Sequence, residues 1–189
     1  MLQQHVLIFG MQGSGKTTIA KKLEIERGYK SINVKDIINV VTSSDYCAPE
    51  KIYKMASSGE ILPERYIVPA FKKLVFSLVN FPQLAFDGYP RSPRQIEHFT
   101  HLMNSNAQEY VCLYLQVDRE TATKRIILRR STLQRPEDQT DELITKRTNQ
   151  FLSEKERSLR LLNKNCKVYI LDGSRSEGEV WNQVRGVLV

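Results

Sequence analysis

The chain has 189 residues and a formal net charge of +7, with 28 Lys and Arg against 21 Asp and Glu. This length suits one domain with a proper core, and no apolar run is long enough to span a bilayer, which argues against a membrane protein. The three cysteines lie far apart and form no C-x-x-C pair, so a zinc site and a disulfide framework are disfavoured and a cytoplasmic, reducing compartment is expected. Cys112 and Cys166 lie in apolar runs and are expected to be core residues.

The excess of basic residues suits three kinds of partner: nucleic acid, an anionic membrane or a phosphorylated small molecule. Arginines gather between positions 125 and 147, but aromatic residues are not interleaved with them, as they are in platforms that stack bases. We therefore expect no nucleic-acid partner. A pocket that neutralises several phosphates explains the charge, and a solvated basic helix face is the alternative for this stretch taken alone.

Apolar segments alternate with helix-prone segments along the whole chain. Five apolar segments are predicted to form strands, namely residues 5–9, 30–33, 84–87, 110–117 and 167–171. Helices are predicted over residues 17–27, in two or three pieces within 35–80, and over 93–103, 118–130, 141–163 and 177–187. This alternation predicts an α/β fold with a doubly wound, five-stranded parallel sheet.

We interpret residues 1–189 as a single domain with two departures from the minimal plan. The core comprises residues 1–33, 81–130 and 141–189, while a helical block covers 34–80 and a short polar segment covers 131–140. Ligands of such folds bind at the carboxyl ends of the strands, so both departures are expected to lie over that edge.

The segment from Gly10 to Thr18 fits the phosphate-binding P-loop, G-x-x-x-x-G-K-[ST], at every fixed position. A predicted strand precedes it and a predicted helix follows it, which is the context that the motif requires. Backbone N–H groups and the helix N-terminus then surround a polyphosphate, Lys16 reaches the β- and γ-phosphates, and the Thr17 hydroxyl ligates Mg²⁺. The expected triphosphate-binding residues are Gly10, Gln12, Gly13, Ser14, Gly15, Lys16, Thr17 and Thr18.

A second motif, Phe86-Asp87-Gly88-Tyr89-Pro90-Arg91, ends the third predicted strand. Asp87 is placed to hold Mg²⁺ through water beside a P-loop, and Arg91 can clamp a phosphoryl group with two hydrogen bonds. Without the P-loop before them, the same residues would be equally typical of a simple turn.

Together these motifs give nearly the whole chain a resemblance to the adenylate kinase family of nucleoside monophosphate kinases. The P-loop is similar to the family's G-x-P-G-S-G-K-G/T-T, with Gln12 in place of the proline, and the second motif is similar to D-G-[FY]-P-R. Residues 123–130 resemble the helix that leads into the lid, and residues 135–138 resemble the lid's R-x-D-D, with Glu137 in place of the first Asp. Lys146-Arg147 and residues 171–175 match two further motifs.

The resemblance implies a monomeric P-loop nucleoside triphosphate hydrolase-like fold, with Mg²⁺ as cofactor and with ATP and a nucleoside monophosphate as partners. Residues 34–80 correspond to the monophosphate-binding arm, and residues 131–140 to a short lid without zinc-binding cysteines. The implied catalytic residues are Lys16, Arg91, Arg129, Arg135 and Arg147. Further implied ATP contacts are Arg125, Arg129 and Arg175, and the implied monophosphate site comprises Val34, Lys35, Asn39, Glu60, Ile61, Leu62, Gly88, Arg91, Gln95, Arg135 and Arg147, with Gln95 reading the base.

The arm departs from the family pattern at three positions. Val34 stands where a threonine or a small residue is usual, Lys35 replaces a glycine, and Asn39 replaces an arginine that grips the monophosphate. An asparagine cannot give charge-assisted bidentate hydrogen bonds, and Lys35 offers only a point charge four residues earlier. The donor site is therefore intact while the acceptor site is altered.

Three functions remain open on these residues. The first is a nucleoside monophosphate kinase with a changed acceptor choice. The second is a P-loop phosphotransferase that acts on another small acceptor. The third is a module that binds ATP with little turnover, against which the retained arginines argue, because pure binding does not need charge around a moving phosphoryl group.

Overall fold

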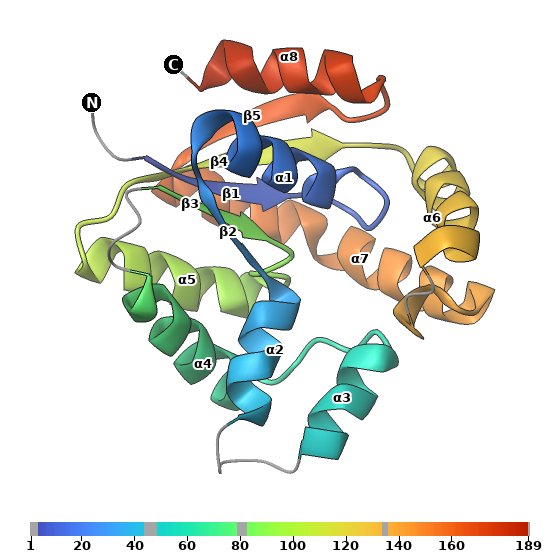
Figure 1. Ribbon diagram of the computed structural model, residues 1–189, viewed down its shortest axis with the longest axis horizontal. Helices are drawn as coiled ribbons and strands as arrows, with labels where there is room; N and C mark the ends of the chain where they lie inside the picture. The colour runs from blue at the N-terminus through green and yellow to red at the C-terminus, as the bar shows by residue number, and fades with distance from the viewer. Residues whose placement is uncertain (1–3, 44–48, 79–82, 134–135, 189) are drawn as a thin grey trace.

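A computed structural model of the chain describes residues 4–43, 49–78, 83–133 and 136–188. Arg135, a predicted site residue, and Cys47 lie outside these ranges. The predicted doubly wound fold is confirmed. A five-stranded parallel sheet lies between two layers of helices (Figure 1).

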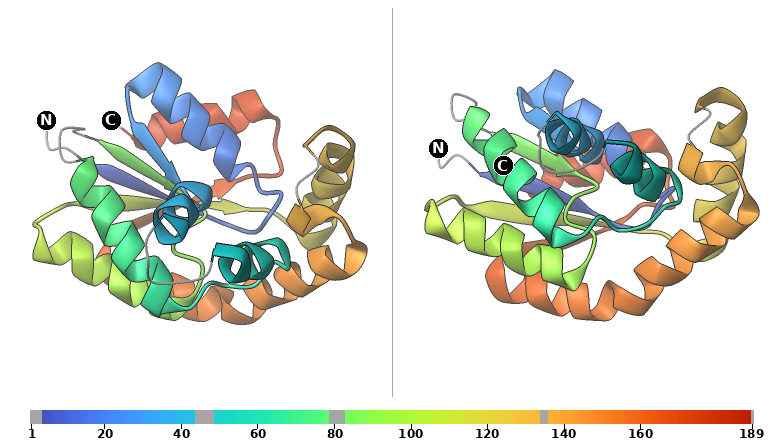
Figure 2. Two further views of the ribbon diagram at one scale, coloured as in Figure 1. Left: turned by 60° about the horizontal axis from the view of Figure 1, so that its bottom comes forward. Right: turned by 90° about the horizontal axis from the view of Figure 1, so that it is seen from below.

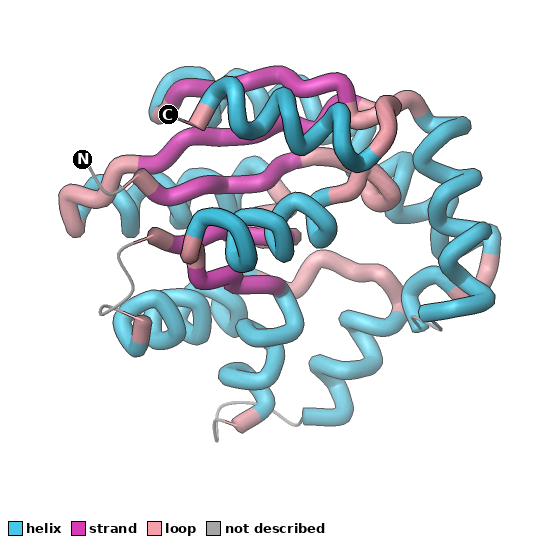
Figure 3. Tube along the Cα trace, turned by 45° about the horizontal axis from the view of Figure 1, so that its top comes forward, coloured by secondary structure: helices cyan, strands magenta, loops and turns pink. Residues whose placement is uncertain are grey.

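The sheet has the order β2-β3-β1-β4-β5, and its neighbouring strands are all parallel. All five predicted strands are present, side by side in Figure 3. Their bounds are β1 His5–Phe9, β2 Lys30–Asn33, β3 Leu84–Asp87, β4 Tyr110–Gln116 and β5 Lys167–Asp172.

Helices cover both faces of the sheet, as Figure 2 shows from two further directions. On one face lie α1 and α8, and on the other lie α4, α5 and α7. The helices are α1 Lys16–Arg27, α2 Val34–Thr42, α3 Pro49–Ser57, α4 Glu64–Ser77, α5 Pro93–Ser105, α6 Arg119–Leu133, α7 Asp141–Asn165 and α8 Glu177–Val187, with a short 3-10 helix at Pro136–Asp138.

The side chains of the central strand β1 explain why helices must pack on both faces of the sheet. Val6 and Ile8 pack in the cluster that contains the apolar side chains of α1 and α8, while Leu7 and Phe9 pack in the cluster that contains those of α4 and α5. Because alternate residues of a strand face opposite sides, a fully apolar run is stable only when both sides are covered. Buried Cys112 lies in the second of these clusters, as predicted, and Cys166 is only partly buried beside it.

The first departure from the minimal plan begins at the carboxyl end of a strand, and the second follows the carboxyl end of another strand by way of α6. Helix α2 starts at Val34, directly after β2, and α6 starts three residues after β4 ends. The sequence suggested that α6 ends near residue 130, but it continues to Leu133, and residues 136–138 form a helical turn. The polar residues of this segment do not prevent helix formation, and the Ser131 hydroxyl donates within α6 to the Leu128 carbonyl.

Candidate active site

The P-loop joins β1 to α1 and lies against the start of α6. Gly13 has a φ of +82°, and a Cβ placed on it would lie 2.4 Å from the Ala122 carbonyl oxygen. Only glycine suits this position, because the backbone conformation and the close approach both exclude a side chain. Helix α1 begins at Lys16, so its free N–H groups point into the loop as predicted.

Lys16 lies at the centre of the site, and its ammonium is folded back onto the P-loop. It donates hydrogen bonds of 2.7 Å to the carbonyl oxygens of Gly10 and Met11. Burial lowers the pKa of Lys16 to about 7. The Asp87 carboxylate opposes this effect, and nearby guanidinium groups add to it, in the order Arg91, Arg147 and Arg129. Lys16 therefore lies within the electrostatic influence of three guanidinium groups and one carboxylate.

Thr17 and Asp87 bring two oxygen ligands together beside Lys16. The Thr17 hydroxyl donates to the Asp87 carboxylate over 2.7 Å, and Asp87 is 7% exposed at the end of β3. No cluster of three or more His, Cys, Asp or Glu side chains suited to a metal occurs among the described residues. Mg²⁺ typically takes one or two protein oxygens and completes its shell with substrate phosphates and water, so the pair of Thr17 and Asp87 fits this ion.

Arg91 and Gln95 connect the loop after β3 to the arm. The Arg91 Nε donates to the Gly88 carbonyl over 2.7 Å, and the Arg91 backbone N–H donates to the Gln95 side-chain oxygen. The Gln95 amide in turn donates to the Leu62 carbonyl over 3.1 Å, and this glutamine is 1% exposed. The structure therefore gives Gln95 a role in holding the pocket wall, in addition to its predicted role in reading a base.

Two predicted arginines meet at one buried carboxylate. Asp138 is 1% exposed, and its two oxygens accept from Arg129 at 2.7 Å and from Arg147 at 2.9 Å. Arg147 is itself 6% exposed, and a Cβ on Gly59 of the arm would lie 2.6 Å from its Cδ. The sequence assigned Asp138 to the lid motif but gave it no role. Its role is to orient both guanidinium groups between the lid and the arm.

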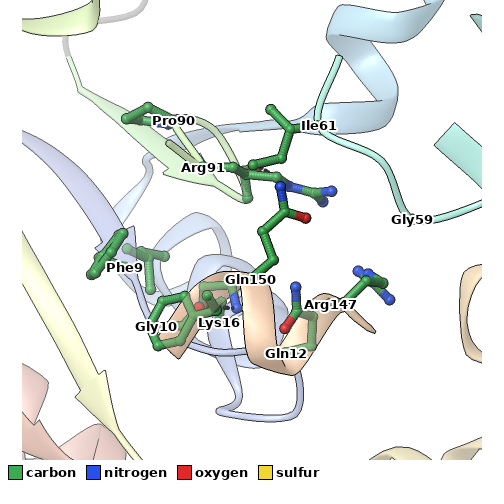
Figure 4. A pocket seen from close by; sticks show the side chains of 13 residues that line it. Phe9, Gly10, Gln12, Lys16, Gly59, Ile61, Pro90, Arg91, Arg147 and Gln150 are labelled. Carbon is green, nitrogen blue, oxygen red and sulfur yellow. Dashed lines mark hydrogen bonds between the residues drawn. The ribbon is translucent and has the colours of Figure 1, made fainter. Parts of the chain in front are cut away.

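Most of the predicted residues line three cavities, while Thr17, Asp87 and Arg129 are not among the residues that line them. The central cavity, of about 60 Å³, is lined by Lys16, Arg91 and Arg147 (Figure 4). One neighbour, of about 260 Å³, is lined by the arm and includes Val34, Lys35, Asn39, Glu60 and Leu62, together with Arg91 and Gln95. The other, of about 270 Å³, is lined by Gly13, Ser14, Gly15, Thr18, Arg125 and Arg175. Gly10, Gln12, Ile61 and Gly88 line the central cavity.

The rim of the 270 Å³ cavity is fixed by Arg125. Its guanidinium donates to the backbone carbonyls of Gly173 and Ser174 over 2.6 and 2.8 Å. Arg175 is held in turn by the Asp172 carboxylate over 2.9 Å. Arg125 therefore ties α6 to the loop after β5, and the two predicted ATP contacts, Arg125 and Arg175, come together at one rim.

At the mouth of the arm, a capping box fixes the start of α2. The Asn33 side chain accepts from the backbone N–H groups of Lys35 and Asp36, and the Asp36 carboxylate accepts from the Asn33 N–H. These bonds set the helix register, so that Val34, Lys35 and Asn39 line the same cavity.

Several lining residues were not expected from the sequence. Gln150 and Phe151 of α7 line the central cavity, and Tyr53 and Ser57 of α3 line the arm cavity. Helical spacing offered a usable signal, because Gln150 and Phe151 stand three and four residues after Arg147 and so share its face of α7.

Comparison with known proteins places this site in a family. A family model described as an AAA domain matches residues 9–144, which is more than half of the chain. The chain belongs to this AAA domain family. It is similar to human adenylate kinase isoenzyme 1, with 26% identity over 180 residues, covering 95% of this chain and 91% of the relative.

Two microbial relatives extend the comparison. The adenylate kinase of Porphyromonas gingivalis is 29% identical over 151 residues, covering 79% of this chain and 77% of the relative. The adenylate kinase of Pyrococcus horikoshii is 26% identical over 214 aligned positions, covering 97% and 95%. The resemblance to adenylate kinases is thus confirmed, and this AAA domain protein is a phosphotransferase. In the described residues, no helix has the length and apolar character needed to cross a membrane.

The Asp138 carboxylate is expected to be essential for the stability of the site. Asp138→Asn removes a buried negative charge that pairs with two guanidinium groups, so the free energy of unfolding should fall by about 3 kcal/mol in urea titrations. Asp141→Asn is the matched control, because Asp141 also pairs with an arginine at 2.7 Å but its side chain is 78% exposed. That control should change the free energy by less than about 1 kcal/mol. Equal losses of unfolding free energy in the two variants would show that the buried ion pairs of Asp138 stabilise the fold no more than the exposed ion pair of Asp141.

Binding of ATP is expected to take up protons. Since the pKa of Lys16 is about 7 in the free protein, the ammonium is mostly deprotonated at pH 8, and contact with phosphates raises its pKa towards the ordinary value. At a pH between the pKa of Lys16 in the free protein and its pKa in the complex, the complex binds more protons than the free protein and ATP do separately. Proton uptake should therefore approach about one proton per ATP at pH 8 and vanish near pH 6. Calorimetry in buffers of different ionisation enthalpy measures this quantity. Proton release, or uptake unchanged in Lys16→Met, would contradict the assignment.

Proposed function

We propose that the chain transfers the γ-phosphoryl group of ATP to a nucleoside monophosphate. The observation that carries the proposal is the arrangement of the three cavities. Lys16, Arg91 and Arg147 line the small central cavity, the P-loop glycines line one neighbour, and the arm lines the other. Two nucleotides placed in the outer cavities would meet at the cations, which is the geometry that phosphoryl transfer between nucleotides requires.

In this proposal some site residues bind the nucleotides, and others stabilise the negative charge of the phosphoryl group during transfer. The P-loop backbone and Lys16 hold the β- and γ-phosphates, while Arg125 and Arg175 frame the base of ATP. Arg91 holds the acceptor phosphate from the opposite side. Arg129 and Arg147, oriented by Asp138, supply positive charge to the moving group, with Arg135 as a further lid arginine on the strength of the family motif.

The proposal includes Mg²⁺, held by Thr17 directly and by Asp87 through water. When bound, this ion would supply positive charge that offsets the negative charge of the ATP phosphates. Action as a monomer is part of the proposal, on the strength of the family resemblance alone. The lid segment 131–140 and the arm would exclude water when both nucleotides are bound, and a salt bridge of 3.7 Å between Lys146 of α7 and Glu60 of the arm lies beside this opening.

A second candidate is transfer to a small acceptor other than a nucleoside monophosphate. The observation that favours it is the composition of the arm cavity, where Val34 and Asn39 replace groups that would bond a base and a phosphate. Lys35 lines the same cavity and offers one positive charge. The monophosphate proposal retains the advantage, because Arg91 lines both the arm cavity and the central cavity.

We expect the nucleoside monophosphate acceptor to bind weakly, and we expect AMP to be a poor acceptor compared with its use by an ordinary adenylate kinase. A panel of nucleoside monophosphates, with ATP at saturation, should give transfer with a raised KM for the acceptor and an ordinary KM for ATP, because the losses fall on one pocket. Asn39→Arg should improve kcat/KM for the monophosphate by about one to two decades, since it restores a hydrogen bond to a charged group.

Asn104→Arg on α5 provides the control, because it adds the same charge on an exposed surface outside the three cavities. It should leave kcat/KM unchanged. Tight binding of AMP by the wild-type protein, with no gain from Asn39→Arg, would show that Lys35 grips the phosphate or that the arm has another acceptor.

A further inference from the structure

The central cavity contains a hydrogen-bond acceptor that the transfer reaction does not use. The side-chain oxygen Oε1 of Gln12 is buried, and no described residue donates a hydrogen bond to it. Buried polar atoms are nearly always paired, so an unpaired one in a ligand cavity points to a missing partner. That partner must be a donor, because a carboxamide oxygen can only accept.

A phosphate group cannot be the partner of this oxygen. Ionised phosphate oxygens are acceptors themselves, and two acceptors repel each other. A water molecule, with two O–H groups, satisfies the Gln12 oxygen and keeps lone pairs free. The cavity of about 60 Å³ has room for one, since a water needs roughly 10–15 Å³.

A second carboxamide lines the same cavity. Gln150 extends from α7 towards Arg91, and Gln12 reaches from the P-loop into the same space (Figure 4). Each carboxamide can both donate and accept, which is the property needed to hold a water and orient its lone pair. A glutamine that orients the attacking water is an established device of P-loop enzymes that hydrolyse nucleotides.

We propose that the protein also hydrolyses ATP when the acceptor is absent, with Gln12 and Gln150 holding the attacking water where the acceptor oxygen would otherwise lie. This inference rests on the proposed function for the position of the γ-phosphate. The water oxygen forms the new bond to the γ-phosphorus, and the bond to the bridging oxygen breaks with its electron pair remaining on ADP. The proton of the water passes to the orthophosphate product.

The acceptor oxygen and the attacking water would compete for the same position beside the γ-phosphate. Hydrolysis should therefore fall when the acceptor is added. Release of orthophosphate from ATP alone should exceed that of Lys16→Ala, purified in the same way, by at least tenfold. Addition of a productive monophosphate should suppress the release. A contaminating ATPase would persist in Lys16→Ala and would ignore the monophosphate, and that outcome would overturn the proposal.

The glutamines are tested by Gln12→Leu and Gln150→Leu, with hydrolysis and transfer measured on the same preparations. Each substitution should lower the ratio of hydrolysis to transfer by about tenfold, the effect of one ordinary hydrogen bond. Gln108→Leu is the control, because Gln108 bonds His5 outside the cavity. It should leave both rates unchanged.

The remaining outcomes separate this inference from the proposed function. Equal losses in both rates would make the glutamines structural supports and overturn the inference. Transfer without any hydrolysis above Lys16→Ala would overturn it as well, while the proposed function stands. Loss of both activities in the wild-type protein would overturn the proposed function together with the inference.

Discussion

The structure depends on holding several positive charges close together. Burial lowers the pKa of Lys16 to about 7, and the nearby guanidinium groups of Arg91, Arg147 and Arg129 add to this effect. Two carboxylates keep the arrangement stable: Asp138 pairs with two of the arginines, and Asp87 faces the lysine. This cluster of basic side chains suits the binding of a polyanion.

The topology explains why these groups meet although they come from distant parts of the chain. Parallel strands all end at one edge, and the order β2-β3-β1-β4-β5 places the P-loop after the central strand. The Asp87 motif follows the strand on one side, and α6 follows the strand on the other. Insertions at this edge then become the arm and the lid, which brings Asp138 and Gly59 into contact with Arg147. The strand order therefore determines which of these groups meet at this edge of the sheet.

Most of the fold could be predicted from the sequence because its signals are local. The apolar runs gave all five strands, and the glycines with Lys16 and Thr17 gave the P-loop and its helix. The pairing of Asp138 with two arginines could not be predicted, because it depends on how α6 and α7 pack. The hydrogen bonds of Gln95 to Leu62 and Arg91, and the unpaired oxygen of Gln12, likewise arise only in the folded chain. The roles of individual site residues stay predictions.

The proposed function requires two nucleotide pockets that open onto a single cluster of cations. Its most direct test is the affinity for a bisubstrate analogue, two nucleosides joined through five phosphates, with adenosine at one end and each common nucleoside in turn at the other. Calorimetry should find one molecule per chain, and for at least one analogue a Kd about a hundredfold or more below that of ATP, as expected for a mimic of the transfer state. Affinities no tighter than that of ATP across the whole series would contradict the proposal, because they would mean that the second pocket does not share the phosphate site.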